Sequence, residues 1–158
     1  EVAIFDDPDI KHRATLERTG FWGAKEAGCI VLAKNTKRFL IAHRSDAVEQ
    51  PGTWGTWGGA IDENSNPRKT VLKELKEETG FNRSIEDIIP LLLYKKGTFQ
   101  YHNYLVVVDK EFTPVLNWEN KGFKWCELGD WPAPLHFGLI SIFSDENSMV
   151  NIRSQIQP

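Results

Sequence analysis

The sequence is poor in cysteine and methionine and contains no long apolar run. Its 158 residues include only two cysteines and one methionine. Two cysteines cannot build the disulfide framework of a small secreted domain, and neither lies in a metal-ligand spacing. No apolar run approaches the ~18 residues needed to span a bilayer, and the first residues lack a signal-peptide pattern. We therefore expect buried thiols at Cys29 and Cys126, and a cytoplasmic protein with no membrane partner.

An excess of positive charge is also missing. Lys and Arg together number 19, Asp and Glu together number 22, and the formal net charge is −3 at pH 7. Because proteins that hold nucleic acid by their general field are basic, this balance argues against a nucleic-acid partner. A hydrophobic content of 41% suffices for one sizeable core. We expect a single domain over residues 1–158, with residues 1–20 as an N-terminal arm. The sequence leaves both a monomer and a homodimer open.

Apolar patterning predicts strands on both sides of one helix. Short apolar or alternating runs bounded by turn residues are typical of strands. Such an order favours an α/β or α+β fold in which a mixed sheet lies between helices. The expected strands are residues 28–33, 39–42, 88–95, 98–108 and 122–127, and the expected helices are residues 67–79 and 135–143, followed by a tail over 148–157.

The stretch from Gly58 to Phe81 combines a glycine pair, a polar loop and the first helix. Asn66 is a favoured helix cap, and Pro67 is favoured at the first helical position. Gly80 is the matching stop signal. On a helical wheel the apolar residues share one face, which we expect to pack on the core: Val71, Leu72 and Leu75.

The same helix carries an acidic stripe made of Glu74, Glu77 and Glu78. Carboxylates at i, i+3 and i+4 repel by a few tenths of a kcal/mol per pair. A divalent cation would remove that repulsion, since Mg²⁺ prefers oxygen ligands and is usually shared between carboxylates and substrate phosphates. The alternative is a solvated surface face, which is common on Glu-rich helices. The lysines of this helix already form a separate solvent face, and this favours the metal site.

This stretch resembles the Nudix box. The positions that match the family pattern are Gly59, Glu74, Leu75, Glu77, Glu78, Gly80 and Phe81. Two positions depart from it, because Ser65 stands where the family has Glu and Lys73 where it has Arg. Lys73 keeps the positive charge but loses the planar, two-pronged geometry of a guanidinium. We therefore expect intact metal ligands and a looser shell around them.

The resemblance implies an α/β/α sandwich and a metal-dependent pyrophosphohydrolase. The activity implied is cleavage of a phosphoanhydride bond in a nucleoside diphosphate linked to another group. A small nucleotide derivative would then be the partner. The residues that the resemblance assigns to Mg²⁺ or Mn²⁺ are the backbone carbonyl of Gly59 and the carboxylates of Glu74, Glu77 and Glu78, and the same three acids would be catalytic.

Two alternatives to that activity remain open at this stage. One is a Nudix-like nucleotide-binding or regulatory domain with weak or no hydrolysis. The departures at Ser65 and Lys73 are its support, and the complete set of helix acids argues against it. The other is processing of RNA 5′ ends, which the acidic charge balance does not favour.

A general base from outside the helix is the least determined part of the expected site. Glu119, in the loop before the strand at 122–127, is the first candidate, and its alternative is an ordinary charged loop residue. Glu111 and Glu127 are weaker candidates.

Substrate contacts are expected from residues that flank the box. Arg44 follows a strand and could contact a phosphate. Trp57 and Tyr101 are the candidates for stacking a base, drawn from an aromatic group that would otherwise fill the core. His102 and His136 are interpreted as structural histidines.

Overall fold

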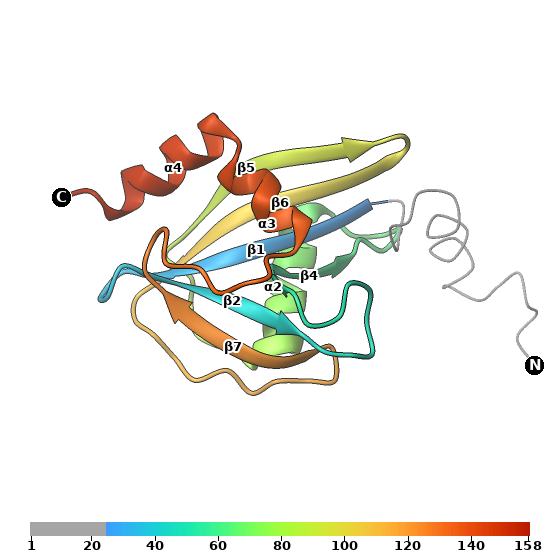
Figure 1. The fold of residues 1–158 in the computed structure, drawn as a ribbon, viewed down its shortest axis with the longest axis horizontal. Helices are drawn as coiled ribbons and strands as arrows, with labels where there is room; N and C mark the ends of the chain where they lie inside the picture. The colour runs from blue at the N-terminus through green and yellow to red at the C-terminus, as the bar shows by residue number, and fades with distance from the viewer. Residues whose placement is uncertain (1–24) are drawn as a thin grey trace, which may run out of the picture.

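The computed structural model describes residues 25–158, and these form one mixed sheet with helices on both faces (Figure 1). The arm expected over residues 1–20 lies outside the described residues. The strands are β1 (Lys25–Ala33), β2 (Arg38–Arg44), β3 (Trp54–Gly55), β4 (Trp57–Ala60), β5 (Asp87–Lys96), β6 (Phe99–Val108) and β7 (Asn120–Cys126). The helices are α2 (Pro67–Thr79), α3 (Phe137–Phe143) and α4 (Glu146–Ile156).

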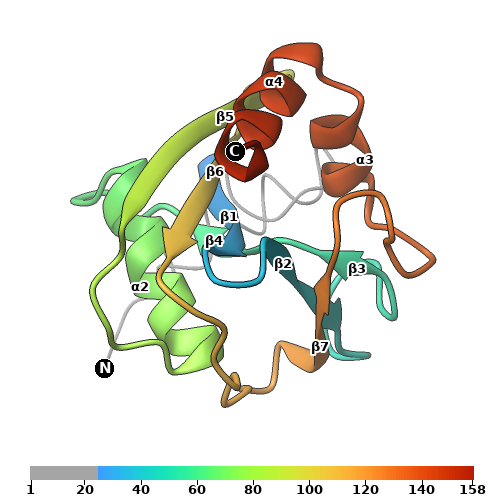
Figure 2. The same ribbon diagram turned by 90° about the vertical axis from the view of Figure 1, so that its left-hand side faces the viewer.

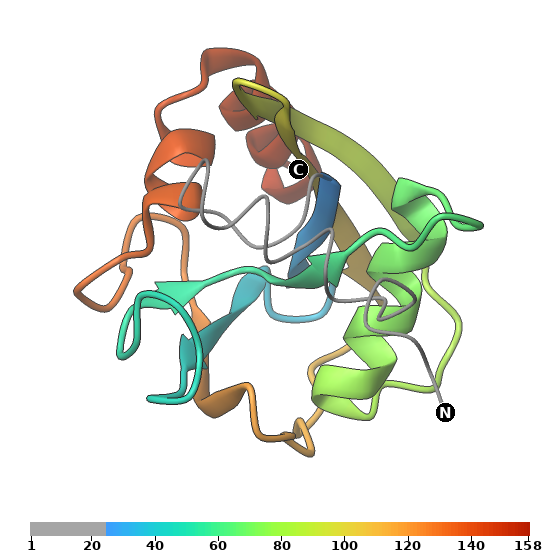
Figure 3. The same cartoon turned by 90° about the vertical axis from the view of Figure 1, so that its right-hand side faces the viewer.

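Two cores lie on opposite faces of this sheet. Alternate residues of β1 point to opposite faces, so that Cys29 and Val31 pack with α2 while Ile30 and Leu32 pack with α3 and α4. Figures 2 and 3 show α2 on one side of the strands and the two C-terminal helices on the other. The predicted α/β/α sandwich is therefore confirmed.

The central strand β1 changes neighbours along its length. Its second half pairs with β2, from Val31↔Leu40 onwards, while its first half pairs with β4, as in Ala27↔Gly59. Its other edge pairs in parallel with β6 over its whole length. Beyond β1, β2 continues against β7 and β3. The strands on the β2 side and those on the β4 side of β1 thus separate from each other. The side chains that line the cavity described below come from the elements on both sides of this separation.

Helix α2 occupies the predicted range of residues 67–79, and the expected residues cap both of its ends. The Asn66 side chain accepts a hydrogen bond from the backbone N–H of Lys69, and Gly80 closes the helix in a left-handed conformation at φ 73°. The C-terminal tail differs from the prediction because it forms helix α4. Asp145 caps α4 by accepting from the N–H of Ser148, and Ile152 is buried beneath it. Its apolar residues are too sparse to indicate a helix without that cap and the sheet it packs on.

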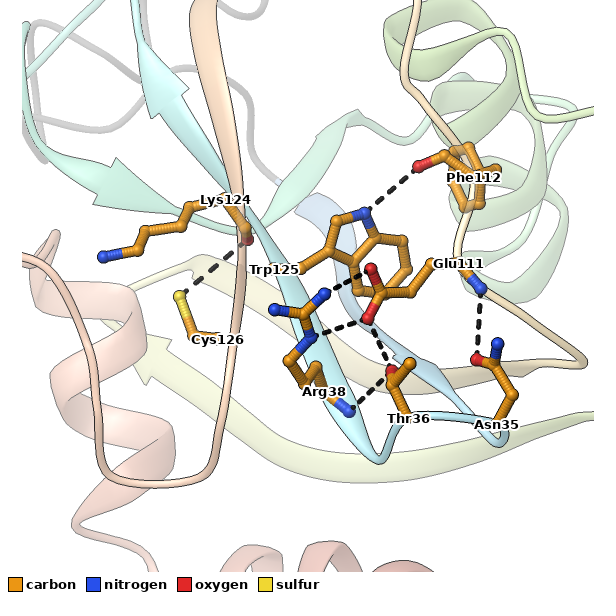
Figure 4. A network of polar contacts seen from close by, with 8 residues as sticks. All are labelled: Asn35, Thr36, Arg38, Glu111, Phe112, Lys124, Trp125 and Cys126. Carbon is orange, nitrogen blue, oxygen red and sulfur yellow. Dashed lines mark hydrogen bonds and ion pairs between the residues drawn. The ribbon is translucent and has the colours of Figure 1, made fainter.

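The loop between β6 and β7 begins with polar contacts to the β1–β2 turn and to β7 (Figure 4). Glu111 receives a two-pronged pair from Arg38, with Nε and Nη2 at 2.7 Å from its two oxygens. Trp125 Nε1 donates to the carbonyl of Phe112 at 3.1 Å. Glu111 is therefore a structural anchor, because both of its oxygens are engaged with the guanidinium.

The structure also bears on the expected burial of the cysteines and on the expected lack of a membrane-spanning segment. Cys29 and Cys126 are both free and buried, as predicted. Among the helices within residues 25–158, none has the length and apolar character needed to cross a bilayer.

Candidate active site

An open cavity lies between the diverging halves of the sheet and the start of α3. Its empty space, counting the part open to solvent, is about 670 Å³. Its walls combine acids, one arginine and aromatic rings. The residues that line it and bear on its chemistry are Glu26, Arg44, Glu78, Tyr94, Phe99, Tyr101, Asn103, Glu119, Asn120, His136 and Phe137.

Helix α2 buries part of its acidic stripe. Glu74 and Glu78 are buried, whereas the side chain of Glu77 is 52% exposed. Leu72, expected in the core, is 41% exposed, so that prediction is wrong. The buried face of the helix has the spacing i, i+1, i+4, i+5, i+8 and i+9, and it consists of Thr70, Val71, Glu74, Leu75, Glu78 and Thr79. Two carboxylates therefore occupy positions that a helix packed on a sheet normally gives to apolar residues.

Gly59 on β4 makes room for the first of these acids. A Cβ atom added there would lie 2.8 Å from Cδ and from Oε1 of Glu74. The backbone of β4 and the Glu74 carboxylate are therefore in close approach, which only glycine permits. Gly59 and the acidic helix are thus adjacent in the fold.

Glu78 is the most buried acid of the cavity. Its Oε1 accepts a hydrogen bond from Asn120 Nδ2 at 3.0 Å, while its Oε2 is buried and has no hydrogen-bond partner among residues 25–158. Burial raises the pKa of Glu78 well above its usual range, and the nearby carboxylates of Glu119 and Glu74 raise it further. Burial followed by the charge of Glu77 raises the pKa of Glu74 to about 7. Among the described residues that line the cavity, three acids thus stand against one arginine: Glu26, Glu78 and Glu119 against Arg44.

Glu119 comes to the same cavity from the loop before β7. It is half-buried, and its backbone is held by Ser45, whose N–H donates to the Glu119 carbonyl at 3.0 Å. Burial raises the pKa of its carboxyl, and the next contribution comes from Glu77. The structure therefore brings Glu119 together with the helix acids, although 41 residues of sequence separate it from Glu78.

The donor set fits a divalent cation. Within residues 25–158, no three His, Cys, Asp or Glu side chains already converge as a finished metal site. Glu77 is turned instead toward Lys73, with Oε1 4.0 Å from Nζ. The oxygens that remain are those a hard cation prefers, and the unpartnered Oε2 of Glu78 lacks the positive partner that a buried carboxylate needs.

The departures from the box at Lys73 and Ser65 involve Asp62, a residue that the box pattern does not define. Lys73 Nζ lies 3.3 Å from the Oδ2 atom of Asp62, so Asp62 and not position 65 supplies its carboxylate. Ser65 contacts the Thr70 hydroxyl at 3.4 Å. Because Lys73, Asp62 and Glu77 are all exposed, these pairs contribute little to stability and act mainly on side-chain orientation.

The structure places two of the three predicted substrate contacts at the cavity and the third in the core. Arg44 and Tyr101 line the cavity. The Tyr101 hydroxyl lies 2.8 Å from the Thr56 hydroxyl, so one donates to the other. Trp57 does not reach the cavity, because its ring is fully buried in the core beneath α2 and its Nε1 donates to the Leu40 carbonyl.

Several cavity residues were not predicted from the sequence. Phe99, Tyr101 and Asn103 alternate along β6 and share one face, so the strand period alone could have added Asn103 to the candidates. No sequence signal indicated Glu26, which the parallel pairing of β1 with β6 places opposite Tyr101.

His136 has the structural role predicted for it and also lines the cavity. Its Nδ1 accepts from the N–H of Gly138 at 2.9 Å, which caps α3. Burial and the charge of Arg44 lower the pKa of His136 to about 4. The ring is therefore neutral at physiological pH and carries its proton on Nε2.

Glu26 should make the metal-free protein less stable as the pH rises. Burial raises its pKa to about 8, Glu49, Glu74 and Glu119 add to the shift, and Arg44 opposes it. When the pKa of an acid is higher in the folded state than in the unfolded state, the acid contributes fully to the free energy of unfolding at any pH below its unfolded pKa, near 4.5. That contribution is lost as the pH rises through the folded pKa of about 8. We expect the Tm of the parent protein in EDTA to fall between pH 6 and pH 9. The Tm of the Glu26→Gln variant should fall by about 4 °C less, which corresponds to a difference of about 2 kcal/mol in the free energy of unfolding. Parallel melting curves for the two proteins would contradict this.

The comparisons with known proteins agree with this geometry. A family model described as the NUDIX domain matches residues 24–144. The dihydroneopterin triphosphate diphosphatase of Haemophilus influenzae is 33% identical over 113 residues, covering 61% of this chain and 69% of that protein. A putative 8-oxo-dGTP diphosphatase 3 of Mycobacterium tuberculosis is 35% identical over 131 residues, covering 75% of this chain and 59% of that protein. The chain thus spans less than two thirds of the latter.

Solved structures share the fold at low sequence identity. A Nudix hydrolase of M. smegmatis, RenU, has a TM-score of 0.67 at 21% identity, with 87% of this chain and 91% of that chain covered. The E. coli dihydroneopterin triphosphate pyrophosphohydrolase has a TM-score of 0.55 at 14% identity, covering 84% and 94%.

Proposed function

The chain belongs to the Nudix hydrolase family, and on that premise we propose that it is a metal-dependent pyrophosphohydrolase acting on a nucleotide derivative. The observation that carries this proposal is the meeting of Glu78 and Glu119 in one cavity, with one oxygen of Glu78 buried and unpartnered. Buried carboxylates without a positive partner are costly. Such an arrangement is expected where a cation and phosphates complete the site.

The proposed cation site uses the box residues. The ligands for Mg²⁺ or Mn²⁺ would be the carbonyl of Gly59 and the carboxylates of Glu74, Glu77 and Glu78. When bound, the cation neutralises phosphate charge and lowers the pKa of water. Glu77 would turn from Lys73 toward the other acids, which is a small change because its side chain is exposed.

The proposed general base is Glu119. The oxygen of a water molecule bonds to a phosphorus atom, the bridging P–O bond breaks, and Glu119 takes a proton from the water. The raised pKa of Glu119 suits this role, because a stronger base accepts the proton more readily near neutral pH. Arg44 lines the cavity and would pair with phosphate oxygens. Its Nε donates to the Glu49 carbonyl at 2.8 Å, and its Nη2 lies 3.7 Å from Glu49 Oε2.

The proposed substrate is a triphosphate of a purine or pteridine. The two relatives are named for dihydroneopterin triphosphate and 8-oxo-dGTP. Both compounds combine a fused heterocycle with a triphosphate, so each contains a diphosphate linked to a further phosphate. The aromatic residues of the cavity support a planar ring system.

The test is a panel of nucleoside and pteridine triphosphates, incubated with Mg²⁺ or with EDTA, and both products identified by mass. We expect a monophosphate and pyrophosphate in Mg²⁺ only. The Glu74→Gln variant should lose at least 90% of the rate, on the order of the effect of removing a proton-transfer group or a metal ligand. Lys69→Gln, on the exposed side of the same helix, is the matched control and should keep the parent rate. Ligand binding without hydrolysis across the panel would instead support a binding or regulatory domain.

A further inference from the structure

Two buried side-chain atoms within residues 25–158 have no hydrogen-bond partner, and both belong to residues that line the cavity. They are Glu78 Oε2 and Asn103 Oδ1. Native proteins seldom leave buried polar atoms unpaired, so each of these two atoms calls for an explanation. The cation proposed above accounts for Glu78. Asn103 lies on strand β6 rather than on helix α2, and it needs a different partner, one that donates a hydrogen bond.

The orientation of the Asn103 amide is determined by its neighbours. Nδ2 donates to the Leu92 carbonyl of the adjacent strand β5 at 2.9 Å, so the amide cannot turn over without losing that bond. The residue is 4% exposed. Its partner in the parallel strand β1 is Gly28, which adds no side chain beside it. Asn103 is thus held as a fixed acceptor in the cavity wall.

The part of the cavity around Asn103 is aromatic. Phe99 and Tyr101 precede Asn103 on the same face of β6, and Tyr94 is opposite Tyr101 in the paired strand β5. Phe137 of α3 closes the group, with its ring centroid 5.6 Å from that of Tyr94. Flat rings of this kind suit the faces of a planar heterocycle, and an acceptor at their edge suits its N–H groups.

We propose that Asn103 determines specificity by accepting, through Oδ1, a hydrogen bond from the amino–imino edge of the substrate base. The base class is a 2-amino-4-oxopyrimidine ring, as in guanine and the pterins, because that edge carries N–H donors side by side. Adenine presents an acceptor nitrogen beside its amino group and fits less well. This inference rests on the proposed function, since the ring lies here only if the phosphates lie at the acids.

The test uses GMP and AMP, which contain no phosphoanhydride bond to be hydrolysed, and measures their Kd calorimetrically in the presence of Mg²⁺. The parent protein should bind GMP more tightly than AMP. Asn103→Leu should weaken GMP binding about 10-fold and leave AMP binding unchanged, the size expected for one lost hydrogen bond. Its Tm is measured alongside to establish that the variant is folded.

A second variant separates the oxygen from the nitrogen of the amide. Asn103→Asp keeps an oxygen acceptor and loses the donor to Leu92, and it should retain the preference for GMP. The proposal is overturned if Asn103→Leu binds GMP like the parent, if it loses GMP and AMP equally, or if both variants lose the preference alike. A failure of hydrolysis with this binding pattern intact would contradict the proposed function alone.

Discussion

Replacing Glu78 with Gln is expected to reduce hydrolysis by about 10²–10⁴-fold, whether this carboxylate acts as a cation ligand or in proton transfer. The substitution keeps the shape of the side chain and its Oε1 acceptor for Asn120. It removes the negative charge, which is the property that the proposed chemistry uses. Initial rates on the best substrate of the panel, at saturating Mg²⁺, measure the effect.

The same substitution is expected to stabilise the metal-free protein. The raised pKa of Glu78 means that ionisation is unfavourable in the fold, so its contribution to stability declines as the pH rises. A neutral Gln avoids that loss, and we expect a Tm in EDTA a few degrees above the parent at pH 8.5. Glu127→Gln, at an exposed strand end, is the control and should change neither quantity. A loss of activity together with a lower Tm would mean that Glu78 is only structural.

Alanine at the two adjacent glycines of β4 should affect different properties: stability at Gly58 and activity at Gly59. At Gly58 an added Cβ would lie 2.3 Å from the Ala27 carbonyl oxygen and 2.5 Å from Gly28 Cα. Both are backbone atoms of the central strand and cannot move aside. We expect Gly58→Ala to lower the free energy of unfolding by about 3 kcal/mol, and the Tm by about 6–12 °C, because it overpacks a rigid contact.

At Gly59 the added Cβ would meet only the end of the Glu74 side chain, which can rotate. Gly59→Ala should therefore fold with a Tm near that of the parent and lose about 10²-fold in activity, since displacement of a catalytic group by about 1 Å has an effect of that order. Thermal melting and initial rates on the two variants separate the effects. Equal activity in Gly59→Ala and the parent would refute the proposed role of this close approach.

The departures from the Nudix pattern acquire a physical meaning in the fold. Lys73 is not left without an acid, because Asp62 takes the place of the missing box glutamate as its partner. The ammonium also lies 4.0 Å from Glu77 Oε1. The partners of Lys73 beside the proposed metal ligands are thus exposed side chains.

Local signals were enough to predict helix α2 and most of the strands. Asn66, Pro67 and Gly80 act through contacts within a few residues, and such contacts depend on the sequence alone. The box spacing likewise indicated the family, the fold and the acids Glu74 and Glu78. Helix α4 was missed because its stability comes from the burial of Ile152 against other elements.

The sequence by itself therefore determined the family, the layered fold and the acidic helix α2. Only the tertiary structure decided which face of that helix is buried, so that Leu72 is exposed while Glu74 and Glu78 are enclosed. It also brought Glu119 to Glu78, moved Trp57 into the core and placed Glu26 and Asn103 in the cavity wall. The reason is that burial and unpaired hydrogen-bonding atoms result from strands that are distant in sequence, and no local pattern encodes that pairing.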